Sequence, residues 1–213
     1  MTITQEGAVV ENFILRGGTI LIKANNVTIR NFIIENPITT GAAIRFESND
    51  VTGGLIEYGE IYGGSATNGV SGSNYTARRL HIHHMQSDCF RVKVNVTIEG
   101  CYLHDFGMGE NSHGDGVQMY PTDGGNMRII GNYIDARGGN AALFQVEGGW
   151  HIEGNYLTGG NFTIYATGAP DQVILNNTWG KDYKYGTLYI GRGDKSLFTW
   201  SGNKWGDGTA YNL

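Results

Sequence analysis

One short pattern of apolar and polar positions recurs along most of the chain. It spans seven residues, in the order apolar, any, Asn or Gly, any, any, apolar, any. A repeat with a period in the low twenties is typical of a β-solenoid, in which each repeat forms one coil. The pattern occurs nine times, with starts 19 to 31 residues apart: VENFILR (10–16), IRNFIIE (29–35), IEYGEIY (56–62), ARRLHIH (77–83), IEGCYLH (98–104), IIGNYID (129–135), IEGNYLT (152–158), ILNNTWG (174–180) and WSGNKWG (200–206).

A second short segment with apolar residues at alternate positions lies between these repeats, and such alternation predicts a strand. Leucine-rich repeats have a similar period, but their LxxLxLxxN pattern is missing. We therefore predict one all-β domain over residues 1–213, a right-handed parallel β-helix of about nine coils. The alternating pairs are Ile20/Ile22, Ile44/Phe46, Phe90/Val92, Val117/Met119, Phe162/Ile164 and Leu188/Ile190.

The fourth and fifth positions of the pattern predict stacks of side chains. In the last four repeats the fourth position is always Asn, which predicts a ladder of amides that satisfies backbone groups of a turn. The fifth position carries aromatic rings in successive repeats, and we interpret them as a structural stack or a sugar-binding platform. The residues are Asn132, Asn155, Asn177 and Asn203 in the ladder, and His81, Tyr102, Tyr133 and Tyr156 in the ring stack.

Residues 77–120 hold two near-copies of one unit, ARRLHIHHMQSDCFRVK and IEGCYLHDF…SHGDGVQMY. Stacked as coils, the copies place Asp88 beside Asp115 and His83 beside His104, about 4.8 Å apart. We take Asp88 and Asp115 as candidate catalytic residues, together with His113 from the insertion DFGMGENSHG, which we interpret as a binding or lid loop. The alternative is that both Asp residues cap turns through backbone N–H groups.

Polar residues point outward from the same strands. Arg91 and Lys93 complete the catalytic candidates, and the candidate substrate-binding residues are Gln118, Tyr120, Gln145, Glu147 and His104.

Four kinds of chemistry suit these residues. Stacked carboxylates raise one another's pKa unless a cation intervenes, so Asp88 and Asp115 would share a proton as a hydrolase acid and base or bind Ca²⁺. In a lyase acting on a uronic acid, a cation neutralises the sugar carboxylate while Lys93, Arg91, His113 or Tyr120 takes the C5 proton. His83, His104 and Asp135 also share a column, which leaves open a His–His–Asp metal site or plain turn histidines.

Composition narrows the function classes. Gly is 34 of 213 residues and Pro only 3, which suits many tight turns. The net charge of −5 with 16% charged residues argues against a nucleic-acid partner. No apolar run approaches the roughly 18 residues of a membrane span, and MTITQEGAVV does not resemble a signal peptide.

The two cysteines allow two interpretations. Cys89 and Cys101 either form a disulfide or are simply small buried residues at turns.

The ends of the chain do not resemble amphipathic caps, although a solenoid exposes strand edges at both ends. We therefore expect other polypeptide or further subunits, for example in a homotrimer, to cover MTITQEGA and GDGTAYNL.

With its V-T-I-x-N-x-x-I coils and GNYI/GNYL turns, nearly the whole chain resembles the parallel β-helix proteins of the pectate-lyase-like superfamily. The order DCFRVK, SHGDGVQ, GGNAALF, GGNFTIY, KDYKYG is similar to β-helix domains of actinobacterial secreted proteins and their phages. The resemblance implies a polysaccharide partner and an extracellular or virion location. Polygalacturonases have a different motif order: here Arg91-Val92-Lys93 precedes Ser112-His113-Gly114, so no catalytic residue is carried over.

From these observations we expect a carbohydrate-active module that binds and cleaves a polysaccharide, with a lyase favoured over a glycoside hydrolase. The alternative is a non-catalytic structural or receptor-binding β-helix of a phage tail or cell-surface protein.

Overall fold

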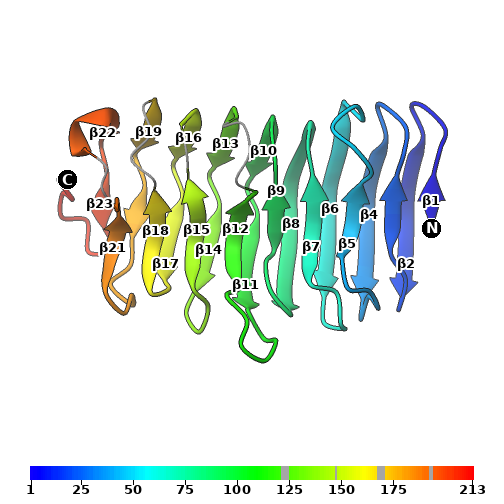
Figure 1. The fold of residues 1–213 in the computed structure, drawn as a ribbon, viewed down its shortest axis with the longest axis horizontal. Helices are drawn as coiled ribbons and strands as arrows, with labels where there is room; N and C mark the ends of the chain where they lie inside the picture. The colour runs from blue at the N-terminus through cyan, green and yellow to red at the C-terminus, as the bar shows by residue number, and fades with distance from the viewer. Residues whose placement is uncertain (121–124, 147, 167–170, 192–193) are drawn as a thin grey trace.

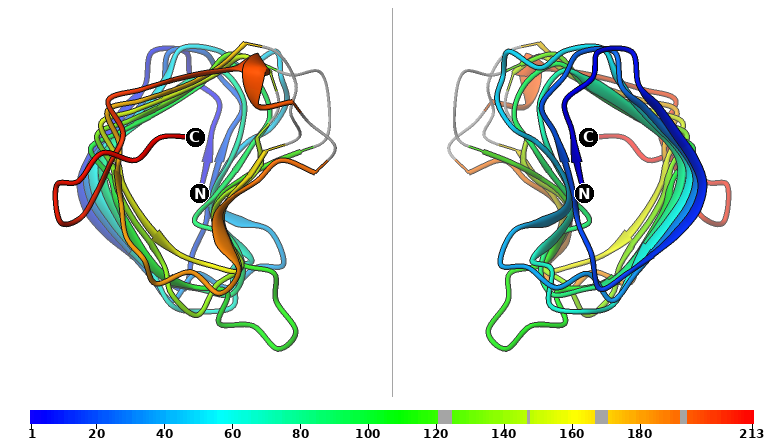
Figure 2. Two further views of the ribbon diagram at one scale, coloured as in Figure 1. Left: turned by 90° about the vertical axis from the view of Figure 1, so that its left-hand side faces the viewer. Right: turned by 90° about the vertical axis from the view of Figure 1, so that its right-hand side faces the viewer.

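The computed structural model describes residues 1–120, 125–146, 148–166, 171–191 and 194–213. Its strands form two parallel sheets. In each sheet the strands stack along one common axis, and the N- and C-termini lie at opposite ends of that axis (Figure 1). Viewed down that axis the coils superimpose (Figure 2). The predicted parallel β-solenoid is confirmed. Nine strands stacked in one sheet enclose about eight complete turns, slightly fewer than the nine coils expected.

One sheet has nine strands, in the order β1-β3-β5-β7-β9-β12-β15-β18-β21. It contains the predicted alternating segments, except that Ile190 lies one residue past the end of β21. Its strands are β1 (Thr2–Ile3), β3 (Ile20–Ile22), β5 (Ala42–Phe46), β7 (Asn68–Gly72), β9 (Phe90–Val92), β12 (Asp115–Met119), β15 (Ala141–Val146), β18 (Phe162–Ala166) and β21 (Gly186–Tyr189).

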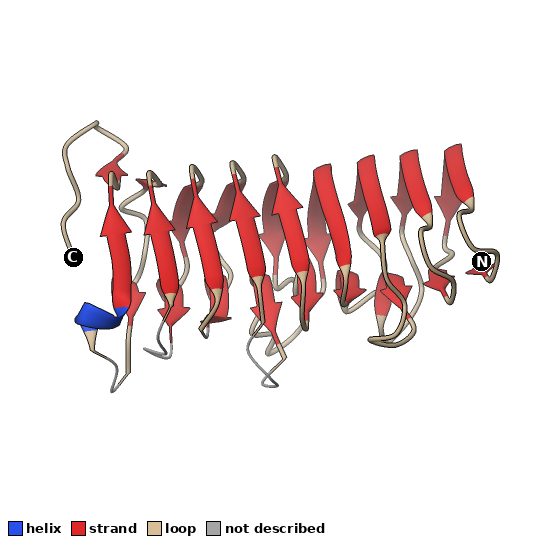
Figure 3. Ribbon diagram, turned by 90° about the horizontal axis from the view of Figure 1, so that it is seen from above, coloured by secondary structure: helices blue, strands red, loops and turns tan. Residues whose placement is uncertain are grey.

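The other sheet has 14 strands and contains all nine seven-residue repeats. Among the described residues the only helix is the short 3₁₀ turn η1 (Lys195–Leu197), drawn blue in Figure 3, so no helix here is long and apolar enough to cross a membrane. The strands are β2 (Val9–Arg16), β4 (Thr28–Glu35), β6 (Gly54–Tyr62), β8 (Tyr75–Met85), β10 (Val96–Glu99), β11 (Tyr102–Phe106), β13 (Met127–Ile130), β14 (Tyr133–Ala136), β16 (Trp150–Glu153), β17 (Tyr156–Gly159), β19 (Gln172–Leu175), β20 (Thr178–Trp179), β22 (Phe198–Ser201) and β23 (Lys204–Trp205).

Apolar side chains from both sheets fill the interior of the coils. One predicted inward pair is wrong: β18 buries Ile164 and Ala166, whereas Phe162 lies partly exposed on the outer face. Cys89 and Cys101 are both buried and both free, so the chain has no disulfide between them.

The Asn or Gly at the third pattern position has a conformational cause. Every residue there has a positive φ, which bends the 14-stranded sheet once per coil. Glycine and asparagine adopt this left-handed conformation at the lowest cost. Tyr58 and Arg79 are the exceptions, and the Arg79 guanidinium donates to the Tyr58 hydroxyl and lies over its ring.

The predicted asparagine ladder is confirmed. Nδ2 of Asn132 donates to Oδ1 of Asn155 (2.9 Å), Nδ2 of Asn155 to Oδ1 of Asn177 (2.9 Å), and Nδ2 of Asn177 to Oδ1 of Asn203 (3.1 Å). Each Oδ1 also accepts the backbone N–H of the residue below it in the stack, starting with Cys101 on Asn132 (2.8 Å). These bonds replace the hydrogen bonds between strands at the bend. The unbroken strands β2, β4, β6 and β8 run through the bend, whereas the later coils split there into two strands.

The C-terminal segment folds back against the last coil. Tyr211 stacks on Trp205 with ring centroids 4.4 Å apart, and its carbonyl accepts the indole N–H of Trp200 (2.8 Å). Tyr211 and Leu213 pack against the core, and the segment runs across the end of the solenoid (Figure 2).

Candidate functional site

The two candidate aspartates lie together at the corner where the chain enters the nine-stranded sheet. Val117 pairs with Phe90, so Asp115 and Asp88, two residues earlier, are vertical neighbours. The backbone N–H of Asp115 donates to Oδ1 of Asp88 (3.1 Å). Both side chains are completely buried, because at this corner they point into the turn and not into solvent.

Burial controls the protonation of this pair. It raises the pKa of Asp88 to about 6, against the opposing effects of the Asp115 N–H, the Arg91 cation and the Ser87 hydroxyl. Burial, with the Asp88 charge as the second cause, raises the pKa of Asp115 to about 8. At neutral pH Asp88 therefore carries the negative charge, and Asp115 keeps its proton and accepts from Nδ2 of Asn140 (2.9 Å).

A Ca²⁺ ion does not fit between these carboxyls. Ca²⁺ takes six to eight oxygen ligands. Oδ1 of Asp88 already accepts two hydrogen bonds and its Oδ2 faces the Arg91 guanidinium (3.4 Å), which leaves Oδ2 of Asp115 as the carboxyl oxygen of the pair without a partner. Arg91 is thus the counter-ion that the chain itself supplies.

Arg91, Lys93 and Tyr120 form one group on the outer face. The guanidinium carbon of Arg91 lies 4.5 Å from the centroid of the Tyr120 ring, and Nζ of Lys93 lies 5.6 Å from the same centroid. Because Asp88 is buried and its Oδ2 faces Arg91, the Arg91 cation has a fixed position. Two cations and a phenol are therefore presented together to solvent.

The polar strip continues onto β12 and β15. Nε2 of Gln118 donates to Oε1 of Gln145 (3.3 Å). Gln145 has a φ of 57°, and the pairing of β15 with β18 shifts register there, so Phe144 and Gln145 are both partly exposed. Glu147, the last residue of the predicted strip, lies outside the described residues.

An aromatic surface extends this strip, and the sequence interpretation missed it. Tyr165 lies between Phe144, Phe162 and Tyr189, with ring centroids 5.1 to 5.4 Å away, and Tyr189 is 47% exposed. The available signal was the alternation within FTIYA, which places Tyr165 outward if Ile164 is inward, whereas Phe162 departs from that alternation. We call the surface formed by Arg91, Lys93, Gln118, Tyr120, Phe144, Gln145, Phe162, Tyr165 and Tyr189 the outer strip.

His113 is exposed and lies in the loop that joins β11 to β12. It precedes β12, whereas Tyr120 follows it, so the two residues lie at opposite ends of a five-residue strand about 17 Å long. The loop projects beyond the entry ends of the strands (Figure 2). The structure therefore places His113 apart from the Arg91–Tyr120 group.

His104 does not belong to the outer strip, which corrects the predicted grouping. It lies on β11 of the 14-stranded sheet, paired with His83 of β8. The chain turns a corner between His83 and Asp88, so the histidines and the strip occupy different faces. The strand register does place His83, His104 and Asp135 in one column, as expected. The Asp135 carboxylate is nevertheless bound by Arg137, whose Nε donates to both of its oxygens (both 2.9 Å).

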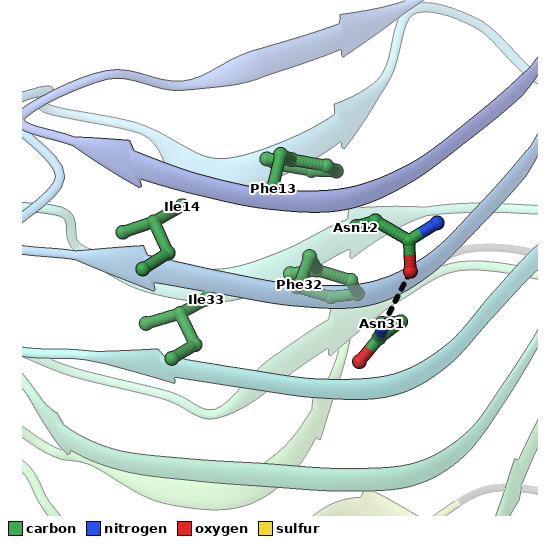
Figure 4. Close-up of a pocket in the computed structure, with 6 residues that line it drawn as sticks. All are labelled: Asn12, Phe13, Ile14, Asn31, Phe32 and Ile33. Carbon is green, nitrogen blue, oxygen red and sulfur yellow. Dashed lines mark hydrogen bonds between the residues drawn. The ribbon is translucent and has the colours of Figure 1, made fainter.

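A shallow pocket of about 310 Å³ lies near the N-terminal end, on β2 and β4. Figure 4 shows Phe13 beside Phe32, and Asn31 donating to Asn12. Its remaining lining residues are Ile14 and Ile33. Since none of the six residues is titratable, this pocket offers no acid–base chemistry.

Comparisons with known proteins find a similar solved structure but assign the chain to no family. No family model and no curated protein matches the chain. The chain is similar to a solved tailspike protein, gp49, of the Acinetobacter baumannii bacteriophage Fri1, which is described as a capsular polysaccharide depolymerase. The TM-score is 0.33 and the identity 12%, over 84% of this chain and 51% of that one, so the chain spans about half of its length. The chain is a parallel β-helix. Its strands pair in parallel from coil to coil in both sheets.

Proposed function

We propose that the chain binds an acidic polysaccharide along the outer strip and cleaves it by β-elimination. The observation that carries the proposal is the group of Arg91, Lys93 and Tyr120, with the Arg91 cation facing the buried carboxylate of Asp88 (3.4 Å). Cations held in place on a surface recognise carboxylates through charge-assisted hydrogen bonds. The aromatic half of the strip gives flat apolar rings on which sugar faces pack.

The same group suits an elimination. Arg91 and Lys93 neutralise the uronate carboxylate, which makes the adjacent C5 proton removable. The Tyr120 oxygen takes that proton while its own hydroxyl proton passes to the leaving oxygen, and the C4–O bond breaks as the C4–C5 double bond forms. Hydrolysis by Asp88 and Asp115 is less well supported, because neither carboxyl has exposed surface to contact a sugar.

A second candidate is a binding or structural module that does not cleave, in a phage tail or on a cell surface. Two observations favour it. The buried Asp88–Asp115 pair has hydrogen bonds typical of a turn cap. At the N-terminal end β2 pairs only with β4 and exposes Val9 (55%) and Ile14 (53%), which suits contact with other polypeptide or with further subunits, as in a homotrimer. Either candidate fits an extracellular or virion location.

A screen of uronate-containing polysaccharides tests the proposal through the absorbance of unsaturated products. We expect Tyr120→Phe to lower the cleavage rate at least about 100-fold, because it removes the proton-transferring hydroxyl but keeps the ring. EDTA should leave the rate unchanged, because Arg91 and not Ca²⁺ meets the carboxylate.

Tyr189→Phe is the matched control, since the same hydroxyl is lost at an exposed position away from the two cations. Equal losses in both variants would contradict the assigned role of Tyr120. Binding without cleavage by the wild type would establish the second candidate instead.

A further inference from the structure

Four histidines gather on the outer face of the 14-stranded sheet, on the opposite side of the coils from the outer strip. His81, His83 and His84 lie on β8, and His104 lies on β11, where it pairs with His83. The side chains of His81, His83 and His104 are 38%, 14% and 17% exposed, so they are reachable from solvent but largely packed. This cluster has no part in the function proposed above.

We propose that His81, His83 and His104 bind a first-row divalent transition-metal ion, Zn²⁺ in the first instance. One potential ligand atom from each of the three residues lies within 4.8 Å of the others. Tetrahedral Zn²⁺ with bonds of about 2.0–2.1 Å needs ligand nitrogens about 3.3 Å apart. In the observed arrangement Nε2 of His81 and Nε2 of His104 are 2.7 Å apart, so these two nitrogens have to separate by about 0.6 Å to share the ion.

The surrounding carboxylates orient two of the rings for this task. Nδ1 of His104 contacts Oδ2 of Asp105 (2.7 Å), and Nδ1 of His81 contacts Oε1 of Glu60 (3.2 Å). A carboxylate on Nδ1–H leaves Nε2 as the free electron-pair donor, which is the usual support of a metal-bound imidazole. These two Nε2 atoms face each other, and Nε2 of His83 contacts the same Oε1 of Glu60 (3.1 Å). Glu60 is a positioning residue here, and the fourth metal position is left to water.

The type of ligand atom decides which ions this cluster suits. Imidazole nitrogens select zinc, copper, nickel or cobalt over calcium and magnesium, which prefer oxygen.

The ion would join two neighbouring coils from outside. His81 and His83 belong to the strand β8 and His104 to the next coil, so a bound ion cross-links segments 21 or more residues apart in sequence. Because the unfolded chain does not hold the three rings together, binding stabilises the folded state.

Titration of the metal-stripped full chain with Zn²⁺ in a calorimeter tests the proposal. We expect one site per chain, a higher unfolding temperature with Zn²⁺ but not with Ca²⁺ or Mg²⁺, and with Co²⁺ the visible absorption of a tetrahedral nitrogen site. His104→Gln and His81→Gln should each weaken Zn²⁺ binding at least about 100-fold, and Glu60→Gln about 10- to 100-fold.

His151→Gln is the matched control, because His151 also faces outward from this sheet and contacts a carboxylate, Oε2 of Glu153 (2.8 Å). It should bind Zn²⁺ as the wild type does. The unfolding temperatures of all variants without metal show whether each one is folded, and two independent ligand variants guard against the failure of one. The proposal is overturned if the wild type does not bind Zn²⁺ or if His151→Gln loses as much affinity as the ligand variants.

Discussion

Replacing Asn155 by Ala is expected to lower the free energy of unfolding by about 3–5 kcal/mol, a large part of the stability of an ordinary domain. The Asn155 side chain is 1% exposed and makes four hydrogen bonds. It donates to the Ile129 carbonyl (2.8 Å) and to Asn177, and it accepts from the backbone N–H (2.8 Å) and the side chain of Asn132. Alanine leaves the Ile129 carbonyl and the Asn132 N–H buried without partners, at about 1–3 kcal/mol each.

Urea denaturation followed by tryptophan fluorescence measures this loss, because Trp150 and Trp179 are buried in the core and report its exposure. Asn161→Ala is the matched control, since the partly buried Asn161 side chain donates one bond, to Asn140 (3.2 Å). It should cost less than about 1.5 kcal/mol. Similar losses in the two variants would mean that the ladder contributes little to stability.

The second large effect is on the pH dependence of stability, through Asp115. Its pKa is raised in the folded chain to about 8 from an ordinary value of 3.8, so the folded state holds a proton that the unfolded chain releases. The stabilisation from that proton is complete below about pH 4 and is lost as the pH rises through about 8. The Asp115→Asn variant carries no such proton. Its stability relative to the wild type should therefore rise by up to about 1.4 kcal/mol per pH unit between these values.

Urea denaturation of both proteins at several pH values gives this difference directly. Asp88, whose pKa is raised to about 6, also makes the free energy of unfolding depend on pH, mainly at acid pH. Both proteins contain Asp88, so subtracting one pH dependence from the other largely removes its contribution. Asp171→Asn makes the same change at an exposed position and is the control for the substitution itself. A difference between Asp115→Asn and the wild type that does not change with pH would show that Asp115 ionises normally in the folded chain.

The repeat pattern predicted the architecture because each of its positions has one physical cause. The apolar positions line the interior, the third position needs a positive φ, and the asparagines at the fourth position bond to one another. Asp88 and Asp115 became neighbours for the same reason, since a period that locates coils also locates vertical contacts.

The parts of the site that the sequence did not predict depend on the directions of side chains. A period shows which coil holds Asp88, but not that the corner turns its carboxyl inward. The bulge at Gln145 breaks the alternation and exposes Phe144, and Phe162 was assigned to the wrong face of β18. Asp135 was expected beside the histidines, but a local ion pair with Arg137 holds it.

The most direct test of the central claim is the affinity for a polyuronate compared with the same polymer after its carboxyls are reduced to alcohols. We expect the wild type to bind the native polymer at least about tenfold more tightly, because each charge-assisted bond is worth more than 1.4 kcal/mol. Lys93→Ala should lose affinity for the native polymer only, and Lys204→Ala, on the opposite sheet, should lose none. Equal affinity of the wild type for the two polymers would contradict recognition of an acidic polysaccharide by the outer strip.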